Sequence, residues 1–323
     1  MKLLYPTSIK LNLEEKLKGL DVTPIAYDPA KPFPDEHVDA DFLVTWANTK
    51  DNLRDAVARM NNLRWIQSLA AGPNDVLSAG FDQSRITVTS GSGLHNLPVA
   101  EHALGLLLTA CRRFHEMRDC QVQRKWAKHL CGDPTIPANM FSTLRNAEIL
   151  IWGYGNIAKT LTPYLKALGA NVRGIAREQG TRDGVEVFTV DQLPTLLPTI
   201  DALVMILPGS ETTRHALNAE RLSYMREHSW VVNVGRGTSV DEEALYEALT
   251  KGQIGGAALD VFETEPLPES SKLWSAPNLV VSPHAAGNRP LGSEDLIREN
   301  LELLIGGKAL KNVMPGTGPQ NKL

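Results

Sequence analysis

EILIWGYGNIA, residues 148–158, is a short apolar run that passes directly into a G-x-G-x-x-A turn. A helix-like stretch, residues 159–168, follows at once, which is the strand–turn–helix context of a dinucleotide-binding unit. Gly153 allows the tight turn, Gly155 lets the backbone approach a pyrophosphate, and the small Ala158 lets the helix pack close to the strand. The helix N-terminus favours the anion. The stretch therefore predicts a nucleotide-binding α/β domain in the middle of the chain.

Three polar stretches further along the chain each follow an apolar, strand-like run. They are Asn233 to Gly237, Asp260 to Pro266 and Ser282-Pro283-His284. In open α/β sheets ligands bind at the carboxyl ends of the strands, so Arg236, Glu265 and His284 are the candidate catalytic residues. An Arg can clamp a carboxylate, and a His can move a proton near neutral pH while a neighbouring Glu orients it. This set suits the reversible reduction of a 2-keto acid.

The immediate neighbours of these residues lead to further expectations. Gly235 and Gly237 flank Arg236 and would let the backbone approach a ligand closely. If Glu265 contacts His284, each charge stabilises the other, which raises the His pKa and lowers the Glu pKa. For most of the remaining histidines we expect surface or structural roles. For His95 and His102 we expect capping or packing, and a position near the cleft between the domains is the alternative.

With these motifs in place, the chain resembles the D-isomer-specific 2-hydroxyacid dehydrogenases, in particular the glyoxylate and hydroxypyruvate reductases. The resemblance covers nearly the whole chain, in order and in spacing. The matching residues are Val99-Ala100-Glu101, Gly153, Gly155, Leu207-Pro208, Asn233 to Gly237, Asp260 to Pro266 and Pro283-His284.

The resemblance implies a role for each of these positions. Arg236 would bind the substrate carboxylate and carbonyl oxygen, His284 would donate the proton with Glu265 as its partner, and Asp260 would lie near the nicotinamide. On the substrate side we expect Arg236, His284, the backbone of Ala71 and Gly72, and Trp46 as a cover of the cleft, although a core position for Trp46 is an equal alternative. The residues expected to bind the cofactor are Gly153, Tyr154, Gly155, Asn156, Ile157, Ala176, Arg177, Leu207, Pro208, Val234, Gly235, Asp260, His284 and Gly287.

The position about 20 residues beyond the glycine turn bears on the choice of cofactor. An acidic residue there normally holds the ribose 2′-OH of NAD, but here Ala176 occupies the place and Arg177 follows it. Arg177 can attract a 2′-phosphate, whereas the adjacent Glu178 opposes one. We therefore expect NADP(H) to be preferred, with NAD(H) possible. A solvent-facing Arg177 with promiscuous cofactor use is the alternative.

Length and composition set the outer limits. The chain has 323 residues with 42% hydrophobic and 22% charged residues, enough for two globular domains. The net charge of −4 gives no basic field for nucleic acid, and no apolar run reaches membrane-spanning length. Met1 to Pro6 predicts a first strand and not a signal peptide. Three cysteines, Cys111, Cys120 and Cys131, show no metal-ligand spacing and indicate reduced thiols in a cytoplasmic protein without a metal site.

The order of strand-like and helix-like runs predicts the domain organisation. We expect an α/β fold of two Rossmann-like or flavodoxin-like domains with parallel sheets, in which a dinucleotide-binding domain (98–286) is inserted into a substrate-binding domain (1–97 and 287–323). A long apolar helix, 98–108, begins the inserted domain, a helix at 293–304 rejoins the first domain, and the tail from Met314 is expected to be loose. The predicted strands are 2–5, 22–26, 42–44, 65–67, 86–89, 148–152, 172–175, 202–206, 230–232, 256–259 and 279–281, and a further predicted helix is 53–60.

The sequence and the resemblance together predict an NAD(P)-dependent reductase that converts a small 2-keto acid of the glyoxylate or hydroxypyruvate type to the D-2-hydroxy acid. The resemblance also implies a homodimer, and we expect the apolar helix 98–108 to contribute to its interface. Formate oxidation is disfavoured, because Glu265 stands where the formate enzymes carry Gln. Two alternatives stay open. One is a phosphoglycerate-type dehydrogenase, although the chain is short for the regulatory domain that many of these carry. The other is a nucleotide-sensing interaction protein that resembles the corepressors on this fold.

Overall fold

A computed structural model of the chain describes residues 1–131 and 140–319. The chain forms two compact units, one made of Met1–His95 with Arg289–Leu323 and the other of Asn96–Asn288. These boundaries lie within two residues of those expected, 97/98 and 286/287. The part of the expected first domain at 320–323 is outside the described residues.

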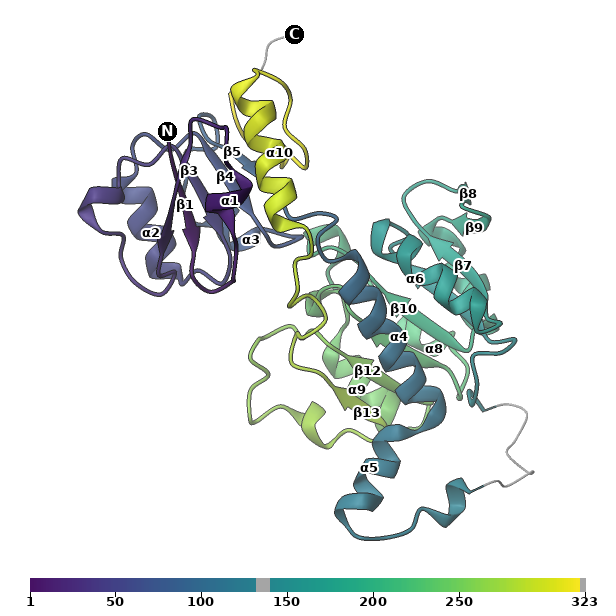
Figure 1. The fold of residues 1–323 in the computed structure, drawn as a ribbon. Coiled ribbons are helices and arrows are strands. Elements are labelled where there is room, and N and C mark those ends of the chain that lie inside the picture. Colours follow the sequence, from purple (N-terminus) through teal and green to yellow (C-terminus); the bar gives the residue numbers. More distant parts are fainter. Residues whose placement is uncertain (132–139, 320–323) are drawn as a thin grey trace. The chain divides into compact units, whose positions relative to one another are not determined.

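The first unit is built on a five-stranded sheet in the order β2-β1-β3-β4-β5, and every neighbouring pair in it is parallel (Figure 1). Its strands are β1 (Lys2–Pro6), β2 (Thr23–Tyr27), β3 (Phe42–Thr45), β4 (Trp65–Ser68) and β5 (Thr87–Thr89). Its helices are α1 (Leu13–Lys16), α2 (Lys50–Arg59), α3 (Asn74–Ser78) and α10 (Ser293–Ile305).

Both faces of this sheet are covered, because successive side chains of a strand point to opposite faces. On β1, Leu4 joins a core with residues of α2 and α3, whereas Leu3 joins a second core with residues of α1 and α10. The strands are therefore apolar on both sides, which is why they read as continuous apolar runs in the sequence.

The helix α10 belongs to this first sheet although the whole second unit separates it from the other elements in the sequence. Ile297 and Leu301 are fully buried against the sheet. The buried amide of Asn300 donates to Gln67 Oε1 at 2.9 Å, and its oxygen accepts from the Lys311 amide at 2.8 Å. The predicted return of the C-terminal helix to the first unit is confirmed.

The expectation of a loose tail from Met314 is wrong for the described part of that segment. The Met314 amide donates to Val88 O at 2.8 Å, and the Gly318 amide donates to Gln83 O at 2.8 Å. Met314 also packs against the core between the sheet and α2. Edge strand β5 offers unpaired backbone groups, and the tail satisfies them in spite of its glycines and prolines.

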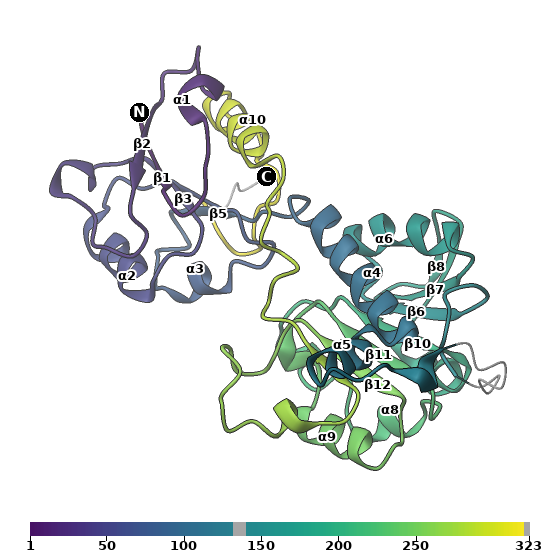
Figure 2. The same ribbon diagram turned by 60° about the horizontal axis from the view of Figure 1, so that its bottom comes forward.

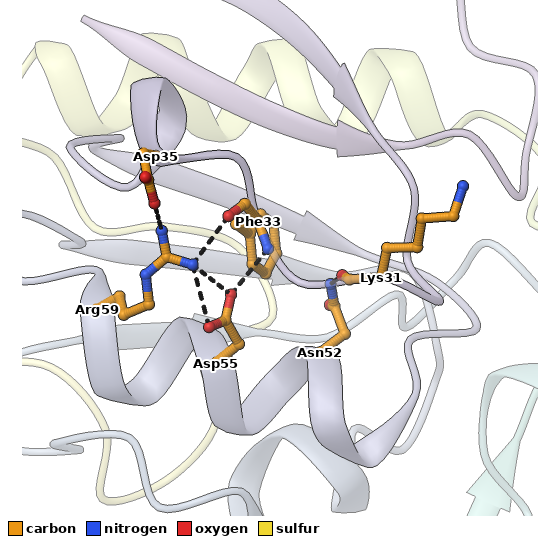
Figure 3. A network of polar contacts seen from close by, with 6 residues as sticks. All are labelled: Lys31, Phe33, Asp35, Asn52, Asp55 and Arg59. Atoms are coloured by element: carbon orange, nitrogen blue, oxygen red, sulfur yellow. Dashed lines mark hydrogen bonds and ion pairs between the residues drawn. The ribbon is translucent and has the colours of Figure 1, made fainter.

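A polar network fixes the segment between β2 and β3 to helix α2 (Figure 3). The Asp55 carboxylate accepts from the Phe33 amide at 2.8 Å, and Arg59 Nη1 donates to Phe33 O at 2.9 Å. Arg59 also pairs with Asp35, and the side-chain amide of Asn52 donates to Lys31 O. These bonds satisfy backbone groups that would otherwise be left without partners in an irregular segment.

The second unit is built on an eight-stranded sheet in the order β13-β12-β11-β10-β6-β7-β9-β8 (Figure 2). All neighbouring pairs are parallel except β8–β9. Its strands are β6 (Glu148–Trp152), β7 (Asn171–Ile175), β8 (Gly180–Arg182), β9 (Val185–Phe188), β10 (Ala202–Met205), β11 (Trp230–Asn233), β12 (Gly256–Leu259) and β13 (Leu279–Val281). Its helices are α4 (Asn96–Arg112), α5 (Phe114–Val122), α6 (Asn156–Ala167), α7 (Leu193–Leu196), α8 (Ala219–Ser223) and α9 (Glu242–Thr250).

Helices also cover both faces of this second sheet. One core joins Ile149 and Ile151 of β6 to residues of α4 and α6, and Figure 2 shows these two helices side by side. The other core joins Leu150 of β6 to residues of α7, α8 and α9. Ala158 is fully buried in the first core, which confirms its expected role in close helix–strand packing.

The predicted strands are confirmed, and their ends differ from the expectation by no more than one residue. The hairpin β8–β9 was not predicted. Its turn is Asp183-Gly184, and both residues have positive φ, 51° and 71°. An Asp-Gly pair is a strong hairpin signal that the sequence offered. No helix in the described ranges is both long and apolar enough to cross a membrane.

Candidate active site

The order of strands in the second sheet reverses between β6 and β10, and a cavity of about 650 Å³ lies at their carboxyl ends. A reversal of this kind opens a crevice where nucleotides bind. The cavity is lined by Trp152, Gly153, Tyr154, Gly155, Ile175, Ala176, Arg177, Glu178, Arg182, Thr189, Val190, Ile206, Leu207, Pro208, Thr212, Thr213 and Ala216.

Half of the expected cofactor residues line this cavity, and the other half lie elsewhere. Those in the lining are Gly153, Tyr154, Gly155, Ala176, Arg177, Leu207 and Pro208. Those outside the lining are Asn156, Ile157, Val234, Gly235, Asp260, His284 and Gly287. Asn156 and Ile157 begin helix α6, and the other five follow β11, β12 and β13 at the same edge of the sheet. The cavity thus occupies only one end of the carboxyl edge of the sheet, along which the expected cofactor residues are spread.

The glycine turn has the geometry that a pyrophosphate needs. Gly153 has a φ of 102°, and a Cβ there would lie 2.5 Å from Ile206 O, so no other residue fits. At Gly155 no heavy atom lies within 4 Å of the position of a Cβ, so the space above it is open. The first amides of α6, a helix of 12 residues, follow directly. An open glycine at the start of a helix suits a dinucleotide phosphate.

Tyr154 contributes to this turn through its backbone. Its side chain is buried, its hydroxyl pairs with Thr162 Oγ1 at 2.9 Å, and its ring lies where a Cβ at Gly174 would stand. The ring therefore fixes α6 against β7 and is not exposed to a ligand. Gly174 is required for packing, a role that the sequence reasoning did not assign.

Two arginines line the cavity beyond β7. Arg177 is exposed, and its neighbour Glu178 lines the cavity as well. Arg182, on β8, was not predicted; it donates to Tyr154 O at 3.0 Å and to Glu178 O at 3.1 Å. Arg182 therefore ties the glycine turn to the segment that carries Arg177. Its position depends on the β8–β9 hairpin, which the Asp183-Gly184 turn signals.

Arg236 follows β11 in a loop that packs tightly on two neighbours. A Cβ at Gly235 would lie 2.6 Å from Leu207 N, and one at Gly237 would lie 1.8 Å from the carbonyl carbon of Phe262. We expected these glycines to allow a ligand to approach. That reason is wrong, since protein backbone occupies the space. Arg236 Nη1 donates to Gly235 O at 2.7 Å, so the glycines hold Arg236 between the loops that follow β10 and β12.

Glu265 and His284 form a pair at the carboxyl edge. His284 Nδ1 lies 2.6 Å from Glu265 Oε2, and Glu265 Oε1 accepts from the Phe262 amide at 2.9 Å. The peptide bond between Glu265 and Pro266 is cis. His284 has a φ of 51°, a left-handed conformation that costs a residue with a side chain roughly 1–2 kcal/mol. The structure therefore holds both partners in place and leaves His284 Nε2 on the side away from Glu265.

The charges of this pair follow from their contact. The hydrogen bond with Glu265 raises the pKa of His284 above its ordinary value, against the lowering effect of partial burial. Burial raises the pKa of Glu265, but the bonds from His284 and the Phe262 amide outweigh it and hold the pKa low. Arg236 is close enough to lower both pKa values. Both directions expected from the sequence are confirmed.

The pair contributes to stability only in a window of pH. Because the folded-state pKa of His284 is raised, its contribution is complete below about pH 6.5, the ordinary His value, and is lost as the pH rises through the raised pKa. Because the pKa of Glu265 is lowered, its contribution is present above about pH 4.3 and is lost as the pH falls through the lowered pKa. Between these two limits, under mildly acidic conditions, His284 is protonated and Glu265 is ionised, so both partners carry their charge.

Asp260, at the end of β12, is the most buried charged group of this edge. Its side chain is 1% exposed. Burial would raise its pKa, but hydrogen bonds from His102, Ser282 and the amides of Ala286 and Ala285 together hold the pKa below its ordinary value. The expected position of Asp260 beside a nicotinamide remains a prediction, whereas its contacts with the chain are shown.

The expected substrate residues other than Arg236 and His284 belong to the first unit. Trp46 follows β3, and Ala71 and Gly72 follow β4, so they lie at the carboxyl edge of the first sheet. Trp46 is half-buried and stacks on His95, with ring centroids 5.6 Å apart. Trp46 thus lies partly buried at the edge of the core, a position that fits both a cover of the cleft and a core residue.

The described residues hold no group of three or more His, Cys, Asp or Glu side chains that could bind a metal ion. All three cysteines are free. The polar chemistry of the edge is instead that of an arginine, a histidine–carboxylate pair and an open phosphate turn. A sheet of this topology with these groups defines a dinucleotide-dependent oxidoreductase that acts on a small acid.

Comparisons with known proteins agree with this class. Residues 104–286 match the family model described as D-isomer specific 2-hydroxyacid dehydrogenase, NAD binding domain. The chain therefore belongs to the D-isomer-specific 2-hydroxyacid dehydrogenases, oxidoreductases that use a nicotinamide cofactor and act on small 2-hydroxy or 2-keto acids.

Individual relatives span most of the chain. Glyoxylate/hydroxypyruvate reductase A of Serratia proteamaculans is 30% identical over 315 residues, 94% of this chain and 95% of the relative. D-3-phosphoglycerate dehydrogenase of Methanocaldococcus jannaschii is also 30% identical, over 88% of this chain but only 54% of the relative. A D-isomer specific 2-hydroxyacid dehydrogenase of Xanthobacter autotrophicus Py2, solved with NADPH and MES, has a TM-score of 0.78 at 28% identity over 98% of both chains.

The charge coupling in the pair can be tested without substrate. We expect Glu265→Gln to lower the pKa of His284, because the neutral amide no longer stabilises the imidazolium while partial burial still opposes it. The measurement is the NMR titration of the His284 ring. The matched control is Glu263→Gln, two residues away, since Glu263 pairs with His215 at 2.9 Å. An unchanged His284 titration in Glu265→Gln would show that the contact does not exist in solution.

Proposed function

We propose that this protein is a cytoplasmic, NADP(H)-preferring reductase of glyoxylate- or hydroxypyruvate-type 2-keto acids that forms the D-2-hydroxy acid. The observation that carries the proposal is the 2.6 Å contact of His284 with Glu265, at the carboxyl edge of the sheet where Arg236 also lies. The similarity to glyoxylate/hydroxypyruvate reductase A over 95% of that enzyme supports the substrate type.

The residues of the edge have distinct tasks in this reaction. When bound, a nicotinamide cofactor would supply the hydride that the keto carbon receives. Arg236 binds the carboxylate and the carbonyl oxygen of the substrate and polarises the latter. His284, whose Nδ1 is held by Glu265, donates the proton on Nε2 to the same oxygen. Glu265 stabilises the imidazolium before the transfer.

The remaining site residues hold the two ligands. The glycine turn, Leu207 and Pro208 would hold the dinucleotide in the cavity at the β6–β10 reversal. Ala176 supplies no acceptor for a ribose 2′-OH, and Arg177 would bind a 2′-phosphate. Ala71 and Gly72 would hold the substrate carboxylate through their backbone, and Asp260 would lie beside the nicotinamide.

Two alternatives are separated from this proposal by one experiment. The first alternative is a dehydrogenase of a phosphorylated acid, which the similarity to D-3-phosphoglycerate dehydrogenase supports. The second is a corepressor-like sensor, which would bind the cofactor without turnover. The test is a panel of glyoxylate, hydroxypyruvate and 3-phosphohydroxypyruvate, each with NADPH and NADH. Highest kcat/KM for one of the first two supports the proposal, whereas a preference for the phosphorylated acid or binding without turnover overturns it.

His284→Ala and Arg236→Ala should both nearly abolish reduction, by different routes. Loss of a general acid typically costs about 10²–10⁴-fold, and for His284 the loss should fall mainly on kcat. Loss of the carboxylate clamp in Arg236→Ala should raise KM as well as lower kcat. Steady-state kinetics give the split, and titration of the cofactor fluorescence should show binding retained in both. Near wild-type kcat at neutral pH in His284→Ala would rule out His284 as the acid.

The choice of cofactor should depend on Arg177. A hydrogen bond to a charged group contributes roughly 1.5–3 kcal/mol, so the native enzyme should prefer NADPH by about 10- to 150-fold in kcat/KM. Arg177→Ala should weaken NADPH and leave NADH almost unchanged. The double change Ala176→Asp with Arg177→Ile should reverse the preference, because it adds a 2′-OH acceptor. Arg145→Ala, an exposed arginine outside the cavity, is the control. A native preference for NADH would contradict this prediction.

We propose a homodimer that uses α4 and the segment after it. Exposed apolar side chains follow α4 in the chain: Phe114 and Val122, at the two ends of α5, are 53% and 65% exposed, and Trp126 after it is 86% exposed. Apolar patches of this kind mark interfaces. Light scattering should give the mass of a dimer at micromolar protein, and Trp126→Glu should shift the mass toward the monomer. Trp274→Glu, at another exposed tryptophan, should leave it unchanged. A monomeric native protein would remove the proposal.

A further inference from the structure

His102, on α4, is joined to the end of the sheet by a short chain of hydrogen bonds. Its Nε2 lies 2.9 Å from Ser282 Oγ, a residue 180 positions away, and 3.2 Å from Asp260 Oδ1. Ser282 follows β13 and Asp260 follows β12. The chain of bonds thus reaches from a helix on one face of the sheet to the edge where His284 lies.

The direction of these bonds follows from the number of protons. The Ser282 hydroxyl donates to Asp260 Oδ1 at 2.6 Å. A hydroxyl has a single proton, so Ser282 Oγ can only accept from His102, which must carry its proton on Nε2. His102 therefore donates toward both Ser282 and Asp260, and the ionised Asp260 carboxylate is the end of the chain.

Asp260 in turn fixes the backbone on which His284 stands. Its carboxylate accepts from the Ala285 amide at 2.8 Å and from the Ala286 amide at 3.0 Å, and its carbonyl oxygen accepts from the His284 amide at 2.8 Å. Three consecutive amides are thus bound to one residue. This matters because His284 has a φ of 51°, which a residue with a side chain keeps only where its surroundings impose it.

We propose that His102 is a positioning residue for His284, which acts through Ser282 and Asp260 to keep the 284–286 turn in the conformation that aims the His284 ring at Glu265. The inference rests on the proposed role of His284 in catalysis. It assigns to His102 more than the capping or packing role expected from the sequence. A purely structural His102 would affect the melting temperature of the unit but not the His284 ring.

The geometry leads to a pair of matched variants. His102→Gln keeps a side-chain N–H donor at about the distance of Nε2, whereas His102→Leu keeps the volume and removes the donor. Removal of a hydrogen bond to a charged group should lower kcat by roughly 10- to 100-fold in His102→Leu. His102→Gln should restore most of this loss. KM should change little in either, because Arg236 is untouched.

The decisive readout uses the protein without substrate. In His102→Leu we expect faster hydrogen exchange of the Ala285 and Ala286 amides and a fall in the pKa of the His284 ring as it leaves Glu265. The charged groups that act on His284 are Glu265, Arg236 and Asp260, and the variant removes none of them. Arg112→Gln, at the exposed end of the same helix, is the control and should change neither readout. If the native protein shows no reductase activity, the proposed function fails while this readout still stands.

Two results would overturn the inference. One is unchanged amide exchange and unchanged His284 titration in a folded His102→Leu. The other is a His102→Gln variant that is as impaired as His102→Leu at an equal melting temperature. Should His102→Leu fail to fold, Ser282→Ala removes the hydroxyl between His102 and Asp260 and leaves only their direct 3.2 Å contact. It must then show both changes at reduced size, and a native-like Ser282→Ala refutes the inference.

Discussion

Loops at the carboxyl edge of the eight-stranded sheet approach one another more closely than a Cβ atom allows. Gly153 lies against Ile206 O, Gly235 against Leu207 N, and Gly237 against the carbonyl of Phe262. These contacts link the loops that follow β6, β10, β11 and β12 into one surface. The cavity, Arg236 and the Glu265 loop all depend on these contacts, because each loop is held in place by the loop packed beside it.

The two carboxylates of this edge differ in their surroundings and therefore in what they can do. Asp260 is 1% exposed and directs its oxygens to two amides, a hydroxyl and an imidazole, all of the protein. Glu265 is 34% exposed, and its bonds go to one amide and to His284. Asp260 thus holds backbone amides in place with its carboxylate. Glu265 lies where its carboxylate can stabilise the imidazole of His284 when that ring is protonated.

Much of this arrangement could be predicted from the sequence, for physical reasons. Strands such as 148–152 and 230–232 are buried on both faces, so they stand out as continuous apolar runs. In a parallel sheet the residues that follow such strands meet at one edge, so the sequence alone predicts that Arg236, Glu265 and His284 share a site. The reason given for Gly235 and Gly237 was wrong, since a requirement for glycine does not reveal whether protein or ligand fills the space.

What could not be predicted depends on contacts between residues far apart in the chain. No local pattern links His102 to Ser282, because their contact depends on how α4 lies on the sheet. Arg182 reaches Tyr154 O only because β8 turns back at Asp183-Gly184. The first contact belongs to a chain of bonds that ends, through Asp260, on the amides of Ala285 and Ala286, and Arg182 also donates to Glu178 O, next to Arg177. The sequence thus predicts the groups that would meet the ligands, while the structure adds the distant side chains that bond to the segments carrying those groups.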